Sequence, residues 1–404
     1  MPVVQLWLLA LAHFGIDLLT HILPPVMPAL VQELGLTVTM AASLSTAMSV
    51  SSGLLQPVFG SAIDRAPRAW LLPVAVLWCG AFVALLGMAS EYWALVLAAV
   101  LAGLGAALFH PLATVSLRHI VGRYSAGAMS IFSVGGTAGM AAAPMAFAAV
   151  SFMGISGLRW LLLPAVVIAA VLLAGGLHRV SLSSTGRRAG AGGGSREGSG
   201  GRSETEAPAG PDAMRPLVIL TVSKLVRTVG QVAMVNFLAL FYVFQGYSEN
   251  HARLMLTVYL VAGSLSAIAT GYISDRIGRK PVVIISSVLA TPAWLAFLFT
   301  TGPLQTGCLI AASVFLYATF SVMPIYAQEL VPRRPGMGAG LMMGGVWALA
   351  ALCLVPLGTL ADAAGVRAAM VVAAWLPLVS AGMALPVPET RPRASRLTFS
   401  SRLL

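Results

Sequence analysis

"GYISDRIGRKP", residues 271–281, is a short charged stretch between two long apolar runs. A related stretch, "GSAIDRAPRAW", occupies residues 60–70 and also separates two apolar runs. The pattern Gly-x-x-x-Asp-Arg therefore occurs twice, at an offset of 211 residues. An internal duplication of a unit of about 200 residues explains this offset most simply.

The composition is that of a membrane protein. Of the 404 residues, 58% are hydrophobic and only 9% are charged, whereas a soluble chain is usually about one quarter charged. Apolar runs of about 20 residues, the length that crosses a bilayer, recur along the chain. We predict an all-α polytopic fold with twelve transmembrane helices. The predicted spans are residues 3–27, 39–62, 70–89, 92–118, 125–150, 157–178, 215–245, 252–274, 281–300, 304–329, 336–361 and 366–387.

The spans fall into two groups of six. Between them, residues 178–216 are rich in Gly, Ser and Arg, a composition typical of a flexible tether. We therefore predict an N-terminal six-helix bundle over 1–178, a linker over 179–214, a C-terminal six-helix bundle over 215–388 and a tail over 389–404.

The net charge of +11 follows the predicted topology. If both termini lie on one side, that side carries 19 of the 24 Lys and Arg residues, and the other carries Arg159, Arg253 and Arg367. The positive-inside rule then places the termini and the linker in the cytoplasm. Because topology explains the basic charge, no nucleic-acid partner is expected.

"GYISDRIGRK" resembles the signature loop of the major facilitator superfamily. Further segments resemble its fosmidomycin resistance protein branch: "GLGAALFHPLA" (103–113), "SIFSVGGTAGMAAAP" (130–144), "VSKL" (222–225) and "YAQELVPRRPGMGAGLMMGG" (326–345). This resemblance implies two six-helix bundles and a monomeric inner-membrane carrier that works by alternating access. It also implies antiport of a drug or metabolite against protons, with antibiotic resistance as one outcome. The proton gradient would be the energy source, and no cofactor is expected.

The signature loops are candidates for gating. Their charges could close the cytoplasmic side when the carrier faces outward, or they could simply anchor the loop at the membrane surface. The candidate gating residues are Asp64, Arg65, Asp275, Arg276, Arg279, Lys280 and Glu329. The first loop has Ala66-Pro67 where the second has Ile277-Gly278. For Glu329, the sequence favours a pair with Arg333 or Arg334.

Three ionisable side chains inside predicted spans are candidates for proton coupling. Asp17 lies about 18 Å along the first span, near the middle of the bilayer, where burial disfavours a charged carboxylate. His13 lies one turn before it, and His110 lies at a similar depth in the fourth span. The alternative for each is a structural hydrogen bond to a neighbouring helix. His21 is expected at the wet outer rim.

The seventh span carries candidates for substrate binding. Lys224, Arg227 and Gln231 share one helical face, and two cations at that depth need a counter-charge such as Asp17 or an anionic substrate. The "VSKL" match falls on Lys224. Asn236 and Tyr242 follow and could line the outer cavity, although core packing is an alternative for the aromatic side chain.

These observations favour a proton-coupled exporter of a small anionic or zwitterionic molecule. Uptake by symport and a non-transporting receptor or scaffold remain alternatives. An enzyme is not expected, because no nucleophile–base constellation appears. No metal site is expected either, because the spacing of the cysteines indicates none.

Overall fold

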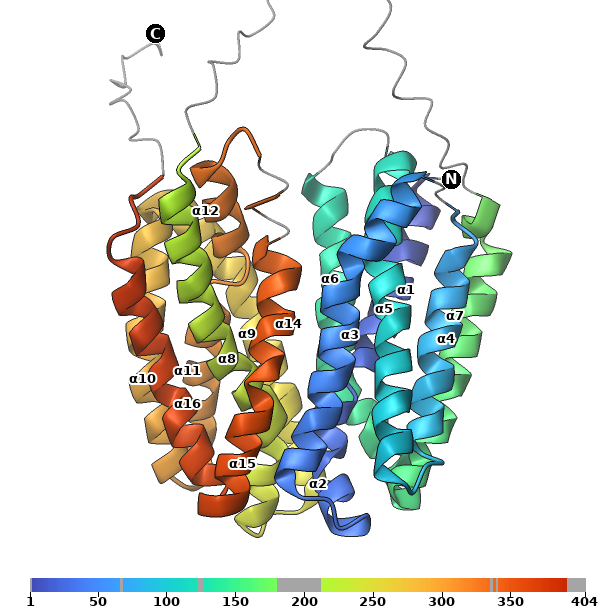
Figure 1. The fold of residues 1–404 in the computed structure, drawn as a ribbon, viewed down its shortest axis with the longest axis horizontal. Coiled ribbons are helices and arrows are strands. Elements are labelled where there is room, and N and C mark those ends of the chain that lie inside the picture. Colours follow the sequence, from blue (N-terminus) through green and yellow to red (C-terminus); the bar gives the residue numbers. More distant parts are fainter. Residues whose placement is uncertain are drawn as a thin grey trace, which may run out of the picture.

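The computed structural model describes residues 2–65, 68–121, 126–179, 212–334, 337–338 and 341–390. Within these ranges the chain is helical throughout and contains no strand. The helices form two six-helix bundles that stand side by side (Figure 1). Most of the predicted linker and tail lies outside the described residues.

The N-terminal bundle begins with a span that is broken in the middle. Pro24 and Pro25 lack the amide hydrogens that would continue the helix, so α1 ends at Thr20 and α2 begins at Leu23. The elements of this bundle are α1 (Pro2–Thr20), α2 (Leu23–Glu33), α3 (Val38–Arg65), α4 (Leu71–Leu86), α5 (Tyr92–Val121), α6 (Ala126–Val150), η1 (Ser151–Leu161), α7 (Leu162–Ala174) and η2 (Leu177–Arg179).

The C-terminal bundle repeats this plan with two further broken spans, α11–α12 and η4–α14–α15. Its elements are α8 (Met214–Phe244), α9 (Glu249–Ile277), α10 (Arg279–Phe299), α11 (Gly302–Tyr317), α12 (Val322–Leu330), η4 (Leu341–Gly345), α14 (Val346–Leu352), α15 (Leu354–Ala364) and α16 (Val366–Ala384).

Ten helical segments among the described residues are long and apolar enough to cross a membrane. One of them, Ile131–Ala174, turns back at Gly154 and makes two passes, and the shorter apolar helix Leu71–Leu86 makes one more. The described chain therefore has the twelve passes that the sequence predicted.

The two bundles contact each other mainly at one end of the molecule. We call the end where α1 and α8 begin and α16 ends the linker end, and the opposite end the hairpin end (Figure 1). Packing between the bundles joins α3 to α14 and α15, α6 to α9, and α2 to α8. The hydrogen bonds between the bundles link Val38 and Thr39 to Asp362, Thr39 to Thr359, Thr46 to Ala351, and Ser151 to Arg253.

All of these hydrogen bonds lie toward the hairpin end. Thr46 lies farthest from it along α3, about 12 Å from the start of that helix. No hydrogen bond or ion pair joins the bundles nearer the linker end, as far as the chain is described. The conformation is therefore closed at the hairpin end.

At two helix starts, a carboxylate from a distant part of the chain accepts hydrogen bonds from the first backbone amides. Glu33 accepts from the amide of Ile155, beside Gly154 (φ +63°). Glu389 accepts from the amides of Arg279 and Lys280, beside Gly278 (φ +106°). A negative charge at a helix N-terminus stabilises it. At both glycines a Cβ would lie 2.5 Å from the carboxylate, so glycine permits the backbone turn and the close approach.

Candidate functional site

Asp17 lies near the middle of the first span, as the sequence predicted. The helical segment runs from Val3 to Glu33, and Asp17 is 14 residues from one end and 16 from the other. Its side chain is 17% exposed and faces His13 and His110. The structure thus brings all three proposed proton-coupling residues together.

The polar neighbours of His13 favour one arrangement of its ring hydrogens. Its Nδ1 is 2.8 Å from the carbonyl oxygen of Phe132, which can only accept, so Nδ1 carries a hydrogen. Its Nε2 is 3.3 Å from Oδ2 of Asp17. A neutral His13 would then point a lone pair at the Asp17 carboxylate. The contact is attractive only when one further proton lies on His13 or Asp17.

His110 approaches the same carboxylate from α5. Its Nε2 lies 3.6 Å from Oδ1 of Asp17, within ion-pair range but beyond a direct hydrogen bond. Within the described part of the chain, these side chains form the one group of three or more His, Cys, Asp or Glu residues whose possible ligand atoms all lie within 4.8 Å of one another. Spacing along the sequence indicated no such group, because His110 is remote from Asp17 in the chain. Two imidazoles and a carboxylate could also receive a divalent cation.

Three glycines of α6 allow α1 to lie close to this group. A Cβ at Gly135 would collide with the carbonyl oxygen of Ala10, and one at Gly139 with that of Phe14. A Cβ at Gly136 would lie 2.5 Å from Nε2 of His13 and 2.6 Å from Oδ2 of Asp17. The glycine-rich segment therefore gives His13 and Asp17 the space that they occupy.

His21 lies between α1 and α2. It follows the C-terminal residue of α1 at the break before α2, and its Nδ1 is 2.9 Å from the carbonyl oxygen of Asp17. The backbone amide of His21 also donates to this carbonyl oxygen, at 3.1 Å. His21 thus lies at the helix break, one turn beyond Asp17.

Lys224 has no hydrogen-bond or ion-pair partner among the residues that the structure describes. It lies on α8 about 15 Å from the start of that helix, and it is only 6% exposed. It makes no ion pair or hydrogen bond with any described side chain, and Asp17, the counter-charge considered for it, contacts the two histidines instead. An unpaired buried ammonium is costly, and it favours a bound anion.

Arg227 is differently placed, although it lies one turn away. It is 1% exposed and donates to the hydroxyl of Ser287 and to the carbonyl oxygens of Phe315 and Leu316. Those carbonyls belong to the last turn of α11, just before the break to α12. Arg227 therefore holds α8 against α10 and α11, where its charge complements a helix C-terminus.

The remaining predicted binding residues are buried in this conformation. Gln231 is 5% exposed, and its Nε2 has no partner. Asn236 donates to the carbonyl of Val232, one turn earlier. Tyr242 lies toward the hairpin end, packed against Phe241, Tyr247, His251 and Phe297. Tyr242 therefore packs in the core of the bundle, which the sequence analysis gave as the alternative to lining the outer cavity.

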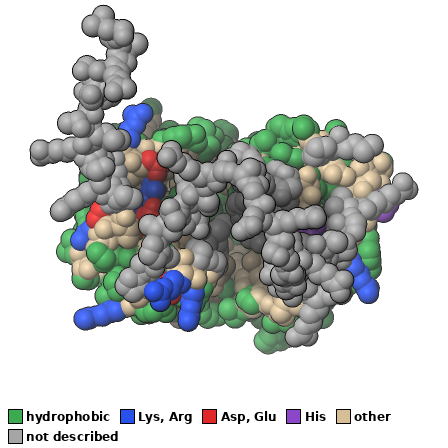
Figure 2. All heavy atoms as spheres, turned by 90° about the horizontal axis from the view of Figure 1, so that it is seen from above, with side chains coloured by type: hydrophobic (Ala, Val, Ile, Leu, Met, Phe, Trp, Pro, Cys, Tyr) green, Lys and Arg blue, Asp and Glu red, His purple; other side chains and the backbone are tan. Residues whose placement is uncertain are grey.

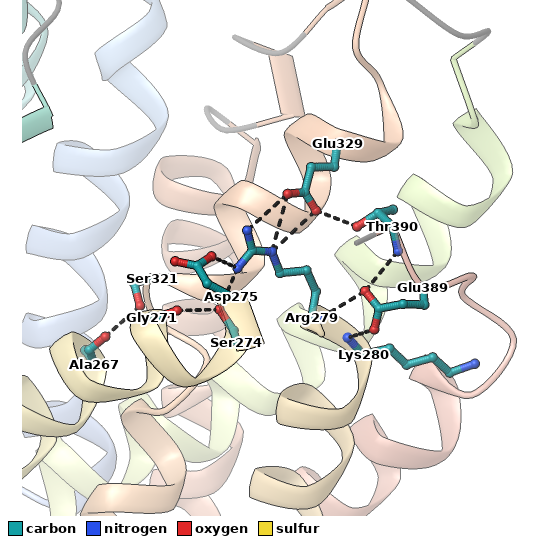
Figure 3. A network of polar contacts seen from close by, with 10 residues as sticks. All are labelled: Ala267, Gly271, Ser274, Asp275, Arg279, Lys280, Ser321, Glu329, Glu389 and Thr390. Carbon is teal, nitrogen blue, oxygen red and sulfur yellow. Dashed lines mark hydrogen bonds and ion pairs between the residues drawn. The ribbon is translucent and has the colours of Figure 1, made fainter. Parts of the chain in front are cut away.

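The second signature loop forms a charged network at the linker end (Figure 3). Arg279 is bonded to Asp275 at 2.5 Å and to Glu329 at 3.2 Å. Thr390 donates to Glu329, and the ammonium of Lys280 donates to the carbonyl of Leu385. All these groups belong to the C-terminal bundle or, for Thr390, to the start of the tail, and Arg276 is exposed beside them.

The partner of Glu329 differs from the expectation. It pairs with Arg279 because α12 ends beside the start of α10, whereas Arg333 and Arg334 lie beyond the helix end and contact Asp212. The side chains of Asp64 and Arg65 lie outside the described part of the structure. From the linker end, the visible acidic side chains lie over the C-terminal bundle, with Lys and Arg side chains among them and at its edge (Figure 2).

Several site residues gave no signal in the sequence. Phe132 stacks on His13 with ring centroids 4.1 Å apart, and Asp362 contacts the start of α3. Arg253 lies between the bundles, bonded to Ser151 and stacked over Phe147. Each acts on a residue more than 100 positions away, so local spacing could not reveal it.

Comparison with known proteins agrees with this architecture. A family model described as Major Facilitator Superfamily matches residues 9–248 and 232–402. The chain belongs to the major facilitator superfamily. It is 30% identical to the fosmidomycin resistance protein of Escherichia coli (strain K12), over 95% of this chain and 92% of that protein. It is 28% identical to the uncharacterized MFS-type transporter YfnC of Bacillus subtilis (strain 168), over 92% and 90%.

The fold is also that of solved transporters. The crystal structure of the nucleoside transporter NupG superposes with a TM-score of 0.75 at 13% identity, covering 95% of this chain and 98% of that one. The chain is thus a multi-pass membrane transporter, and not an enzyme, as the sequence predicted.

Proposed function

We propose that this carrier exports a small anionic or zwitterionic molecule in exchange for protons. Asp17 and His13 hold the proton, His110 adjusts the charge around them, and Lys224 contacts the substrate. Both termini and the linker lie in the cytoplasm, and the hairpin end faces outward. The carrier acts as a monomer and needs no cofactor beyond the proton gradient.

One observation carries the proposal. In the middle of the span, Nδ1 of His13 faces the carbonyl of Phe132 and its Nε2 faces the carboxylate of Asp17, an arrangement that favours an additional proton between His13 and Asp17. Loss of that proton leaves a lone pair facing a carboxylate in a site with little water, which is unfavourable. Proton release therefore favours a rearrangement of α1 against α6, whose glycines pack on it.

The unpaired Lys224 supports an anionic substrate. No described carboxylate of the other bundle pairs with it, and the described acids of its own bundle lie at the helix ends. The relative named for fosmidomycin resistance supports export and makes that drug a reasonable probe. Proton-coupled uptake is the alternative direction, and a receptor or scaffold the alternative class.

Reconstituted vesicles with an internal pH dye test the proposal. Fosmidomycin and simple organic anions are added to vesicles that hold the full chain, with and without a chelator that removes trace divalent cations. We expect substrate-driven proton movement that is lost in Asp17→Asn. Exposed Glu91 provides the matched control, Glu91→Gln, which should keep it.

Each result has a distinct meaning. Proton movement that persists in Asp17→Asn contradicts the assignment of the proton site. Movement that requires divalent cations would mean that the three-residue group binds a metal instead. Absence of any movement with every anion would favour the receptor or scaffold, and the sign of the pH change decides between export and uptake.

A further inference from the structure

Ten buried side-chain polar atoms have no hydrogen-bond partner in the described part of the C-terminal bundle. Four of them form a group: Nε of Arg227, Nε2 of Gln231 and the hydroxyl oxygens of Tyr259 and Tyr317. They come from α8, α9 and the end of α11. A buried donor without a partner costs about 1–3 kcal/mol, so a group of them in one region calls for an explanation.

These atoms lie in one neighbourhood. The rings of Tyr259 and Tyr317 contact each other edge to face, with centroids 5.7 Å apart. Gln231 approaches Tyr317 without completing a hydrogen bond, and Arg227 is close enough to Tyr259 to interact electrostatically. The ring of Tyr317 packs on Gly263 of α9, where no side chain could fit.

Lys224 lies on the same face of α8 as Arg227 and Gln231. Spacings of three and four residues bring side chains of a helix together. The ammonium of Lys224 is also unpartnered, so the region presents two positive charges and several free hydrogen-bond donors. Each member of the set is more than nine-tenths buried, which removes water as an easy partner.

We propose that Tyr259, Tyr317 and Gln231 form, with Lys224, a subsite for the oxyanion group of the substrate. The ammonium supplies charge, while the two hydroxyls and the amide nitrogen donate hydrogen bonds to the oxygens. Arg227 adds positive potential, but its terminal nitrogens already donate hydrogen bonds to Ser287 and to carbonyl oxygens of α11. The subsite rests on the proposed function, and it extends that function by naming the bound group as a phosphate, phosphonate or carboxylate.

The unpaired state of the hydroxyls makes a sharp test possible. A tyrosine that only stabilises the fold loses stability when its bonded hydroxyl is removed. Here Tyr259→Phe and Tyr317→Phe break no hydrogen bond within the free protein, so its melting temperature should stay the same or rise. Each variant should nevertheless bind the anion roughly three- to tenfold more weakly, because one donor is missing in the complex.

The experiment uses the full chain in lipid nanodiscs. Inorganic phosphate, methylphosphonate and acetate serve as probes, and acetamide serves as the uncharged analogue of acetate. Binding is followed by isothermal calorimetry, and melting by intrinsic fluorescence. Tyr272→Phe is the matched control, because Tyr272 lies on α9 but is 73% exposed.

The subsite is supported if Tyr259→Phe and Tyr317→Phe bind the anion more weakly while their melting temperatures stay the same or rise. Tyr272→Phe should bind the anion as the wild type does. Unchanged affinity in the double variant, equal binding of acetamide, or a lowered melting temperature would overturn it. The pH-dye assay separates the two proposals. Asp17-dependent proton movement driven by an uncharged substrate would retain the coupling and remove the oxyanion subsite.

Discussion

The carboxylate of Asp362 on α15 accepts a hydrogen bond of 2.5 Å from the hydroxyl of Thr39 at the start of α3, in the opposite bundle. The same carboxylate accepts from the amides of Val38 and Thr39, at 2.7 and 2.9 Å. A side chain of one bundle thus caps a helix of the other. Because the cap can form only while the hairpin end is closed, it biases the carrier toward this conformation.

Replacing Asp362 should therefore open the hairpin end. Asp362→Asn keeps the shape of the side chain but removes its charge. The closed conformation should lose about 1 kcal/mol of stability relative to the open one, which increases the open population about fivefold. Spin labels on Glu91→Cys and Thr301→Cys, in a background without the three native cysteines, report the distance between the bundles. Asp212→Asn, which alters an ion pair with Arg334 at the linker end, is the control. An unchanged distance distribution in Asp362→Asn would show that the cap does not set the equilibrium.

Gly136 should be indispensable to transport. A methyl group there would displace His13 or Asp17, and overpacking of this kind costs about 1–3 kcal/mol. We expect Gly136→Ala to lose proton movement in the vesicle assay. Gly307→Ala on α11 has no atom within 4 Å of the added carbon and should behave as wild type. Normal transport by Gly136→Ala would mean that the helices adjust without disturbing the proton site.

The two cations of α8 should respond oppositely to removal. Arg227→Met leaves the hydroxyl of Ser287 and two carbonyls of α11 unpaired, so the melting temperature should fall. Lys224→Met removes an unpaired buried charge, so the melting temperature should hold or rise while anion binding is lost. Fluorescence melting and calorimetry on both variants measure this. Equal destabilisation would show that Lys224 has a structural partner.

Gly278 should matter for two separable reasons. Its backbone has φ +106° and ψ 162°, and Gly365 is a close match with φ +87° and ψ 153° but no atom within 4 Å of an added carbon. Both Gly278→Ala and Gly365→Ala should cost about 1–3 kcal/mol through backbone strain. Gly278→Ala should lower the melting temperature further, because it also displaces Glu389 from the start of α10. Equal melting temperatures would assign the whole effect to the backbone.

Much of this site follows from local sequence. His13 and Asp17 are four residues apart on one helix, so helical geometry brings them together without any tertiary information. The same holds for Lys224, Arg227 and Gln231 on α8. The meeting of His110 with Asp17 is different, because it depends on the packing of α5 against α1.

The partners of Glu329 and Arg227 illustrate why the rest could not be predicted. Glu329 has two arginines close by in sequence, yet it pairs with Arg279, 50 residues away. Arg227 appeared equivalent to Lys224, and only the position of the broken helix α11 separates their roles. A charge can pair with any group that the fold brings near, and spacing along one helix does not define those neighbours.

By itself the sequence determined the membrane setting, the twelve passes, the duplicated signature loop and the position of Asp17 near the middle of its span, because hydropathy and helical periodicity act locally. Only the tertiary structure decided which groups meet. It placed the carbonyl of Phe132 on His13, left Lys224 and two tyrosine hydroxyls unpaired, and closed the hairpin end with Asp362. These features depend on contacts between helices that are distant in the chain, and such contacts exist only after the bundles pack.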